Sequence, residues 1–226
     1  MRLLSDATSQ AARAALGRAF RDARRMPGNL LAYDRLDELI AAAHRIVMDV
    51  ERLPEAPDSF TGLDGHPIDA TAAGLLVGRR LELPGHQMSQ LGLGLFLQDI
   101  GLLALPPAIV HKAEPLAEDE RELLRRHPLR GLEFLRNEEI GAEARSVVRS
   151  HHERWDGAGY PAGLSGEQIP LFARIATLAE AFTGTPSRPA VVETLRAGAG
   201  SAFDPELVEV FAEVAMAESP RVPVPA

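Results

Sequence analysis

Apolar residues recur every three or four positions along most of the chain, which is the spacing of helices that bury one face. Ala12, Leu16 and Phe20 follow this spacing up to the helix-breaking pair Pro27–Gly28, and a second apolar stripe runs over residues 36–50. We therefore predict two N-terminal helices. They form either an antiparallel pair or a regulatory or dimerising appendage, and the sequence leaves both interpretations open.

From residue 66 onward the same periodicity continues in segments that proline and glycine separate. The last segment has a clear start, because Asp204 is a good N-cap residue and Pro205 suits the first helical position. The final residues, 218–226, have the composition of a disordered tail. The predicted helices cover residues 67–81, 86–103, 118–127, 129–137, 140–152, 170–183, 189–197 and 205–217.

The composition favours helices packed on helices. Hydrophobic residues make up 46% of the chain and aromatic residues only 5%, with few of the bulky residues that fill sheets. The predicted fold class is therefore all-α. The absence of cysteine excludes disulfides, thiolate metal sites and cysteine nucleophiles, and it is compatible with a reducing cytoplasm.

Charge and hydropathy narrow the class of partner. The chain lacks a run of 18 apolar residues and a signal-peptide core, which predicts a cytoplasmic protein without membrane insertion. Its net charge of -8 argues against binding nucleic acid. Residues 1–28 carry six arginines and only two acids. An arginine-rich helix that complements an acidic body is the simpler interpretation, and a site for an anionic partner is the alternative.

Four polar residues occupy positions that the periodicity assigns to apolar faces. Asp99 continues the spacing of the leucines before it, and His127, His151 and His152 stand in the same relation to the apolar residues that precede each of them. A single inward histidine is more often a satisfied core residue than a ligand. Burying several imidazoles with a carboxylate is best explained by a shared cation, and this ligand mixture suits Fe, Mn, Zn or Ni.

The most specific motif is the string His-His-Glu-Arg-Trp-Asp-Gly-Ala-Gly-Tyr-Pro over residues 151–161, followed by Ile-Pro-Leu at 169–171 and Ala-Arg-Ile at 173–175. It resembles the corresponding motifs of the HD-GYP family of metal-dependent phosphohydrolases. The resemblance implies an HD-domain-like helical bundle over residues 61–217, preceded by a helical segment over 1–60. It also implies that His151 and His152 bind metal and that the loop with Gly159, Tyr160 and Pro161 faces substrate.

The resemblance extends to several single positions. Asp99 matches the family's bridging aspartate and would be the catalytic residue, and His127, before proline, matches a further metal ligand. The preceding position, a histidine ligand in the family, is Gln98 here, and Leu102 replaces the lysine that faces phosphate. His66 stands at the spacing of the family's first histidine, although a histidine in a loop is nearly as good an interpretation because Pro67 follows it.

The downstream part of the motif is also altered. Glu180 keeps a carboxylate at the late metal-binding position, where the family has aspartate, and Thr183 replaces a second acid. The following stretch is shorter than in the family, and Arg188 would be the remnant of its nucleotide-holding segment.

The family hydrolyses cyclic di-GMP to pGpG or GMP. With one complete metal position and a depleted second one, we expect one or two divalent transition metal ions and weak or absent turnover. The leading interpretation is a regulatory or interaction module of cyclic di-GMP signalling. An active phosphodiesterase that uses Gln98 and Glu180 as ligands, and a structural protein that binds neither metal nor nucleotide, are the alternatives. Cyclic di-GMP, a protein partner and a homodimer all stay open as interactions.

Overall fold

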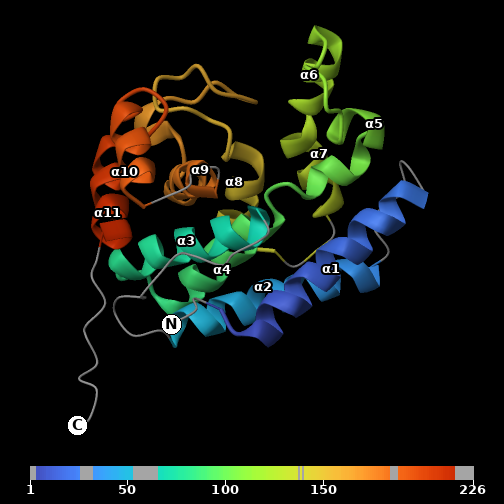
Figure 1. The fold of residues 1–226 in the computed structure, drawn as a ribbon, viewed down its shortest axis with the longest axis horizontal. Coiled ribbons are helices and arrows are strands. Elements are labelled where there is room, and N and C mark those ends of the chain that lie inside the picture. The colour runs from blue at the N-terminus through green and yellow to red at the C-terminus, as the bar shows by residue number, and fades with distance from the viewer. Residues whose placement is uncertain are drawn as a thin grey trace.

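The computed structural model describes residues 4–25, 33–52, 66–136, 138, 140–183 and 188–216. Within these residues the chain forms helices and no β-strand (Figure 1), which confirms the predicted all-α class. The elements are α1 (Asp6–Arg25), α2 (Tyr33–Glu51), α3 (His66–Arg80), α4 (Gly85–Leu97), the 3₁₀ helix η1 (Ile100–Ala104), α5 (Pro107–Val110), α6 (Glu118–Leu124), α7 (His127–Phe134), α8 (Ala142–Ser150), the 3₁₀ helix η2 (Gly166–Gln168), α9 (Leu171–Thr183), α10 (Arg188–Ala197) and α11 (Pro205–Met216).

Most predicted helices are present with boundaries shifted by a few residues. Asp204 caps α11 as expected, because its Oδ1 atom accepts the backbone N–H groups of Glu206 and Leu207 at 2.9 and 3.3 Å. The short helices α5 and η2 were not predicted. The predicted tail and the predicted domain boundary near residue 60 lie outside the described residues.

Two predicted helices are wrong at the positions that matter most for the site. The helix predicted over 86–103 ends at Leu97, and Asp99 (φ -94°, ψ 8°) joins α4 to η1. The helix predicted over 118–127 ends at Leu124, and His127 begins α7 instead of ending α6. The reason for the second error is Pro128, which cannot continue a helix from the preceding turn but fits the first turn of a new one.

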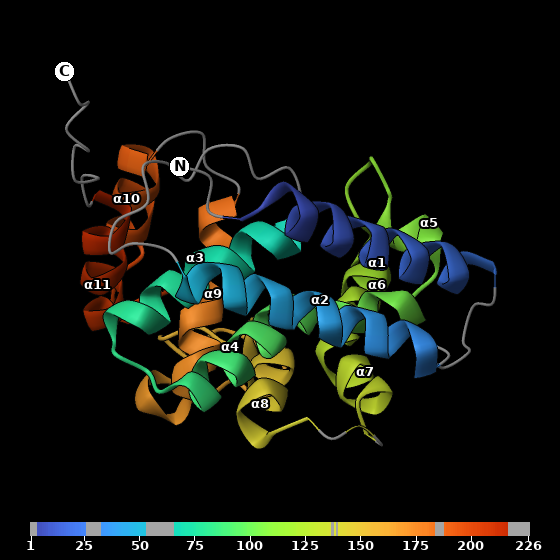
Figure 2. The ribbon, with the colours of Figure 1, turned by 90° about the horizontal axis from the view of Figure 1, so that it is seen from below.

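The N-terminal helices α1 and α2 run antiparallel along one side of the molecule (Figure 2). Helix α2 packs on α3 and α4, and α1 packs on α2 and reaches η1. An ion pair between Arg18 and Glu38 (Nε to Oε2, 2.7 Å) links the two helices, and the backbone N–H of Ser5 donates to Asp49 Oδ2 at 2.8 Å. The antiparallel pair is therefore part of the packed body.

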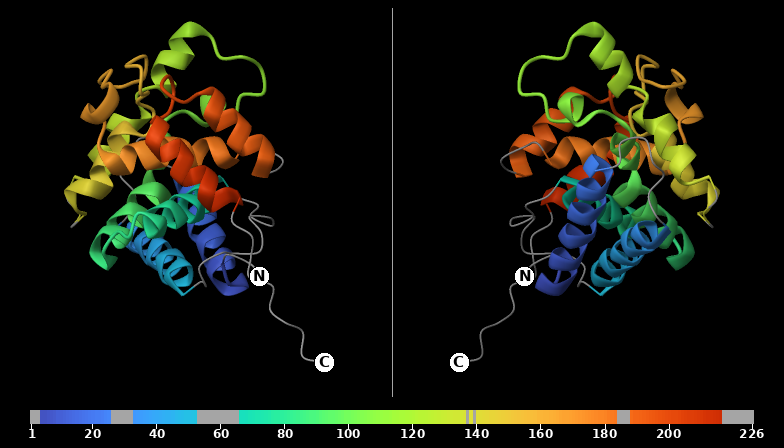
Figure 3. Two further views of the ribbon diagram at one scale, coloured as in Figure 1. Left: turned by 90° about the vertical axis from the view of Figure 1, so that its left-hand side faces the viewer. Right: turned by 90° about the vertical axis from the view of Figure 1, so that its right-hand side faces the viewer.

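The core is a single cluster of buried apolar residues that extends from α1 to α11. Helices α3, α4, α8 and α9 pack directly on one another at its centre. Helix α6 lies on the side opposite α1 and α2, and the loop that follows α8 lies beside α9 (Figure 3). Among the described helices, none combines the length and apolarity needed to cross a bilayer.

Candidate metal centre

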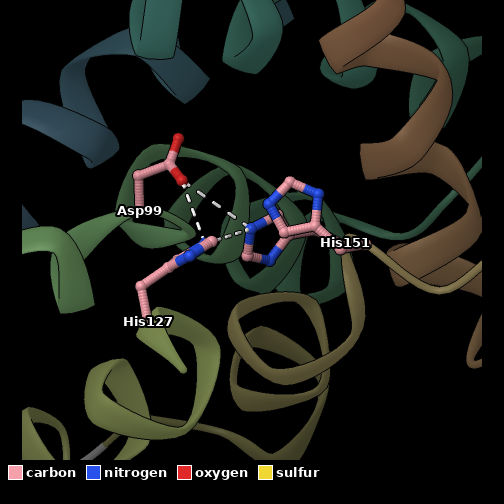
Figure 4. Close-up of side chains that lie close together, drawn as sticks. Asp99, His127 and His151 are labelled. Carbon is pink, nitrogen blue, oxygen red and sulfur yellow. Dashed lines mark hydrogen bonds and ion pairs between the residues drawn. The ribbon is translucent and has the colours of Figure 1, made fainter. Parts of the chain in front are cut away.

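Three segments that are distant in sequence bring the polar residues of the site together. Asp99 lies between α4 and η1, His127 opens α7, and His151 and His152 follow the last turn of α8. One ligand atom from each of these four residues lies within 4.8 Å of the others. Figure 4 shows Asp99, His127 and His151 pointing toward one another. Of the six residues predicted as metal ligands, these four form one cluster.

Hydrogen bonds to the backbone orient two of the imidazoles. His127 Nδ1 lies 2.8 Å from the carbonyl oxygen of Leu124, and His151 Nδ1 lies 3.1 Å from that of Val147. A carbonyl oxygen only accepts, so each Nδ1 carries the proton and each neutral ring turns its Nε2 lone pair to the other side. This is the arrangement in which second contacts commonly hold metal-binding histidines.

The Nε2 atoms face one another around Asp99. They are 3.1 Å apart, and Asp99 Oδ1 lies 3.4 Å from Nε2 of His127 and 3.7 Å from that of His151. Two lone pairs and a carboxylate at these distances repel one another unless a cation or a proton lies between them. Three imidazoles and one carboxylate are a suitable donor set for a first-row transition metal ion. The residues present therefore fit such an ion.

The electrostatics of the cluster agree with a cation site. Burial favours the neutral form of Asp99, but its interactions with His127 and His151 outweigh burial and hold the pKa of this carboxyl far below its usual value. Burial also opposes the charging of His151, and Asp99, followed by Glu180, overcomes this effect and raises the pKa of His151. Asp99 therefore keeps its negative charge, which favours a positive charge beside it, either a metal ion or a proton on His151.

The other predicted ligands lie at the margin of the cluster. Glu180, on α9, approaches it through His152, with its Oε2 atom 3.7 Å from His152 Nδ1. His66 is the first residue of α3, so it lies at a helix start and not in a loop, while its side chain lies outside the described part of the chain.

Gln98 and Leu102, where the sequence departs from the family motif, are respectively buried and apolar. Gln98 is fully buried, and neither polar atom of its side chain has a hydrogen-bond partner among the described residues. Leu102 lines a small pocket together with Phe20 of α1 and Leu103. Residue 102 is thus apolar and lies on η1, the element that α1 contacts.

Two glycines allow the backbone to close around the site. A Cβ atom at Gly101 would collide with the carbonyl oxygen of His127, so the step after Asp99 requires glycine to bring η1 against α7. A Cβ atom at Gly159 would collide with the backbone of Glu153 and Arg154, which is where the loop folds back toward the histidines.

The glycine-rich loop places Tyr160 beside His152. Its ring stacks on that of His152, with centroids 4.7 Å apart and an interplanar angle of 25°, and the Tyr160–Pro161 peptide bond is cis. The predicted substrate residues Gly159, Tyr160 and Pro161 thus lie next to a predicted ligand. The side chain of Arg188, at the start of α10, lies outside the described residues.

Sequence reasoning missed the residues that hold this loop. Glu153 is 1% exposed, and its two carboxylate oxygens accept the backbone N–H groups of Ala162 (2.7 Å) and Leu164 (3.0 Å). Thr177 on α9 donates its hydroxyl to the carbonyl oxygen of His151 at 2.8 Å. Glu153 stands inside the recognised string, but its role depends on contacts that the string does not reveal.

A family model described as an HD domain matches residues 31–207. The chain is 34% identical over 214 residues to the cyclic di-GMP phosphodiesterase PA4108 of Pseudomonas aeruginosa, which covers 88% of this chain and 51% of that protein. It is 38% identical over 148 residues to the cyclic di-GMP phosphodiesterase response regulator RpfG of Xanthomonas campestris, which covers 60% of this chain and 39% of that protein. The chain belongs to the HD-GYP branch of the HD domain family.

Solved structures support the same fold for this HD-GYP domain. A cyclic GMP-AMP-specific phosphodiesterase of Vibrio cholerae, V-cGAP3, aligns with a TM-score of 0.55 and 26% identity over 66% of this chain and 43% of the other. Bd1817, an HD-GYP protein of Bdellovibrio bacteriovorus, aligns with a TM-score of 0.59 over 92% of this chain and 72% of the other, and at 15% identity it bears on the fold alone. The chain spans about half, or less, of the length of the two curated relatives.

Proposed function

We propose that this chain is a degenerate HD-GYP domain that holds one divalent transition metal ion and acts in cyclic di-GMP signalling as a regulatory or interaction module with weak or absent diesterase activity. The observation that carries the proposal is the contrast between two neighbouring positions. The cluster of Asp99, His127, His151 and His152 is compact, with potential ligand atoms within 4.8 Å, whereas Gln98 is a buried amide.

The metal would be held by Asp99 and the three histidines, with Glu180 next to His152. A bound divalent ion supplies a Lewis acid that polarises a phosphoryl oxygen and lowers the pKa of bound water. The backbone carbonyls of Leu124 and Val147 keep His127 and His151 in the tautomer that such an ion requires.

The second metal position has a weaker set of donors. An amide oxygen of Gln98 is a poorer donor than imidazole for first-row ions, and the buried side chain has no partner that would orient it, among the described residues. Leu102 lines a pocket with Phe20 and offers no charge to a phosphate. Losing one such contact to the transition state commonly slows a reaction about 100- to 1,000-fold.

Metal content and turnover together test the proposal. The chain would be purified without chelator, analysed for bound metals, and assayed for hydrolysis of cyclic di-GMP with added Mn or Fe. We expect one metal ion per chain and no detectable turnover. Two ions per chain with turnover would instead establish the active phosphodiesterase in which Gln98 and Glu180 serve as ligands.

A gain-of-ligand variant makes this experiment sharper. Gln98→His restores an imidazole at the depleted position and should raise the metal content above that of the parent chain. Gln87→His, on the partly exposed face of the same helix α4, is the matched control and should leave the metal content unchanged. Equal metal content in all three proteins would contradict a vacant second position next to Gln98.

A further inference from the structure

Arg125 differs from its neighbours in what it contacts. It is exposed at the C-terminal end of α6, where its backbone N–H donates to the carbonyl oxygen of Arg121 at 3.0 Å, and its guanidinium carbon lies 5.7 Å from the centroid of the Tyr160 ring. Within the described residues, no carboxylate forms an ion pair with it. Three nearby arginines, in contrast, each pair with a carboxylate: Arg121 with Glu118, Arg126 with Glu122, and Arg130 with Glu133.

Arg125 is connected to the metal centre in two ways, along the chain and across the fold. Along the chain, it follows Leu124, whose carbonyl oxygen accepts the Nδ1–H of His127. Across the fold, it contacts Tyr160, whose ring stacks on His152. Arg125, Tyr160 and His152 therefore link the exposed surface to the cluster of predicted ligands.

The electrostatics of this region favour a cation there. Two carboxylates lie in this region, because Asp99 belongs to the cluster and Glu180 Oε2 lies 3.7 Å from His152 Nδ1. The same two carboxylates would repel an approaching anion. A positive charge beside Tyr160 offsets this repulsion, and Leu102 does not supply one.

We propose that Arg125 is a phosphate-binding residue at the mouth of the metal centre, with its guanidinium held by the Tyr160 ring and its N–H groups available to phosphate oxygens. The proposal rests on the function proposed above, because the phosphate in question is that of a cyclic dinucleotide. A guanidinium suits this role: it stays charged, it stacks on aromatic rings, and it binds two phosphate oxygens at once.

Inorganic phosphate is the probe that isolates this contact. The full chain would be loaded with manganese, freed of excess metal and titrated with phosphate by calorimetry, with metal content and melting temperature measured for every variant. Arg125→Gln should weaken phosphate binding about tenfold or more, because a charge-assisted hydrogen bond is lost. Arg126→Gln removes the same charge one residue away, from a surface ion pair with Glu122, and should change the affinity less than about twofold.

A second variant keeps the test decisive if Arg125→Gln alters metal binding. Tyr160→Leu retains the charge and removes the ring that holds the guanidinium, so it should also weaken phosphate binding. Three results would each overturn the assignment. The parent and Arg125→Gln could bind phosphate with equal affinity, Arg125→Gln and Arg126→Gln could lose affinity equally, or the parent could fail to bind phosphate.

A parallel titration with cyclic di-GMP separates this proposal from the proposed function. If the phosphate results hold and cyclic di-GMP also binds through Arg125, both proposals are supported. If the phosphate results hold but cyclic di-GMP does not bind, Arg125 is still a phosphate-binding residue, and the role in cyclic di-GMP signalling has to be abandoned.

Discussion

Replacing Gln98 with methionine should stabilise the metal-free protein. Gln98 is fully buried at the end of α4, and its amide oxygen and nitrogen have no hydrogen-bond partner among the described residues. Burying an unpaired amide costs about 1–3 kcal/mol in mutational data. Methionine is unbranched, similar in length and comparable in helix propensity, so it removes the polar atoms without opening a large cavity.

The expected gain is therefore about 1–3 kcal/mol in the free energy of unfolding. For a chain of this size each 1 kcal/mol shifts the melting temperature by about 2–4 °C, so the midpoint should rise by about 2–12 °C. The assay is thermal and urea unfolding of chelator-treated protein, followed by circular dichroism. Gln87→Met, a partly buried position on the same helix, is the matched control and should change stability by less than about 0.5 kcal/mol.

A lower midpoint in Gln98→Met than in the parent would refute this reasoning. It would mean that the amide has a partner in solution, such as an ordered water molecule, whose loss costs more than the buried polar atoms. Metal content gives a second criterion. If Gln98 is not a ligand, Gln98→Met and the parent should bind the same amount of metal, whereas a clear loss in the variant would identify Gln98 as a donor.

Three further changes test the structure around the site. His127→Ala should bind less metal by elemental analysis. Chelation should lower the melting temperature of the parent, because it removes a stabilising ligand, but should leave that of His127→Ala unchanged; an equal shift in both would contradict the assigned cluster. Glu153→Gln leaves one of the backbone N–H groups of Ala162 and Leu164 facing an amide donor, so backbone amide hydrogen exchange in the loop should become faster and the free energy of unfolding should fall by about 1–3 kcal/mol. Unaltered exchange would show that the loop keeps its conformation without Glu153. Phe20→Ala should lower stability by about 1–3 kcal/mol in urea unfolding, because it removes apolar contact between α1 and η1, and no change would mean that this contact contributes nothing to α1 docking.

The sequence by itself predicted most of the helices and the four residues that form the polar cluster. Apolar periodicity depends on local geometry alone, since residues three or four apart share a helix face, and it therefore predicted most of the helices. The pair Asp204–Pro205, also a local signal, predicted the cap of α11. The same rule identified Asp99, His127, His151 and His152 as polar residues on apolar faces. Their joint occurrence predicted a cluster that the structure contains.

Periodicity failed where the backbone leaves the helix. The start of α7 at His127 is a local event, and Pro128 was its signal in the sequence. The break at Asp99 is tied to packing instead, because Gly101 must approach the carbonyl oxygen of His127. The pattern of apolar residues alone predicted regular helices through Asp99 and His127, because it contains no information about the contact between Gly101 and His127.

Only the tertiary structure decided how the site is assembled and what surrounds it. His127 and His151 are 24 positions apart, and packing of η1, α7 and α8 brings their Nε2 atoms to 3.1 Å. The pocket that Leu102 lines with Phe20 and the position of Arg125 over Tyr160 each bring together segments that no local pattern relates. The burial of Gln98 without a partner among the described residues depends on the same packing. Periodicity reports which side of a helix is buried, whereas the distance between side chains depends on how the helices pack.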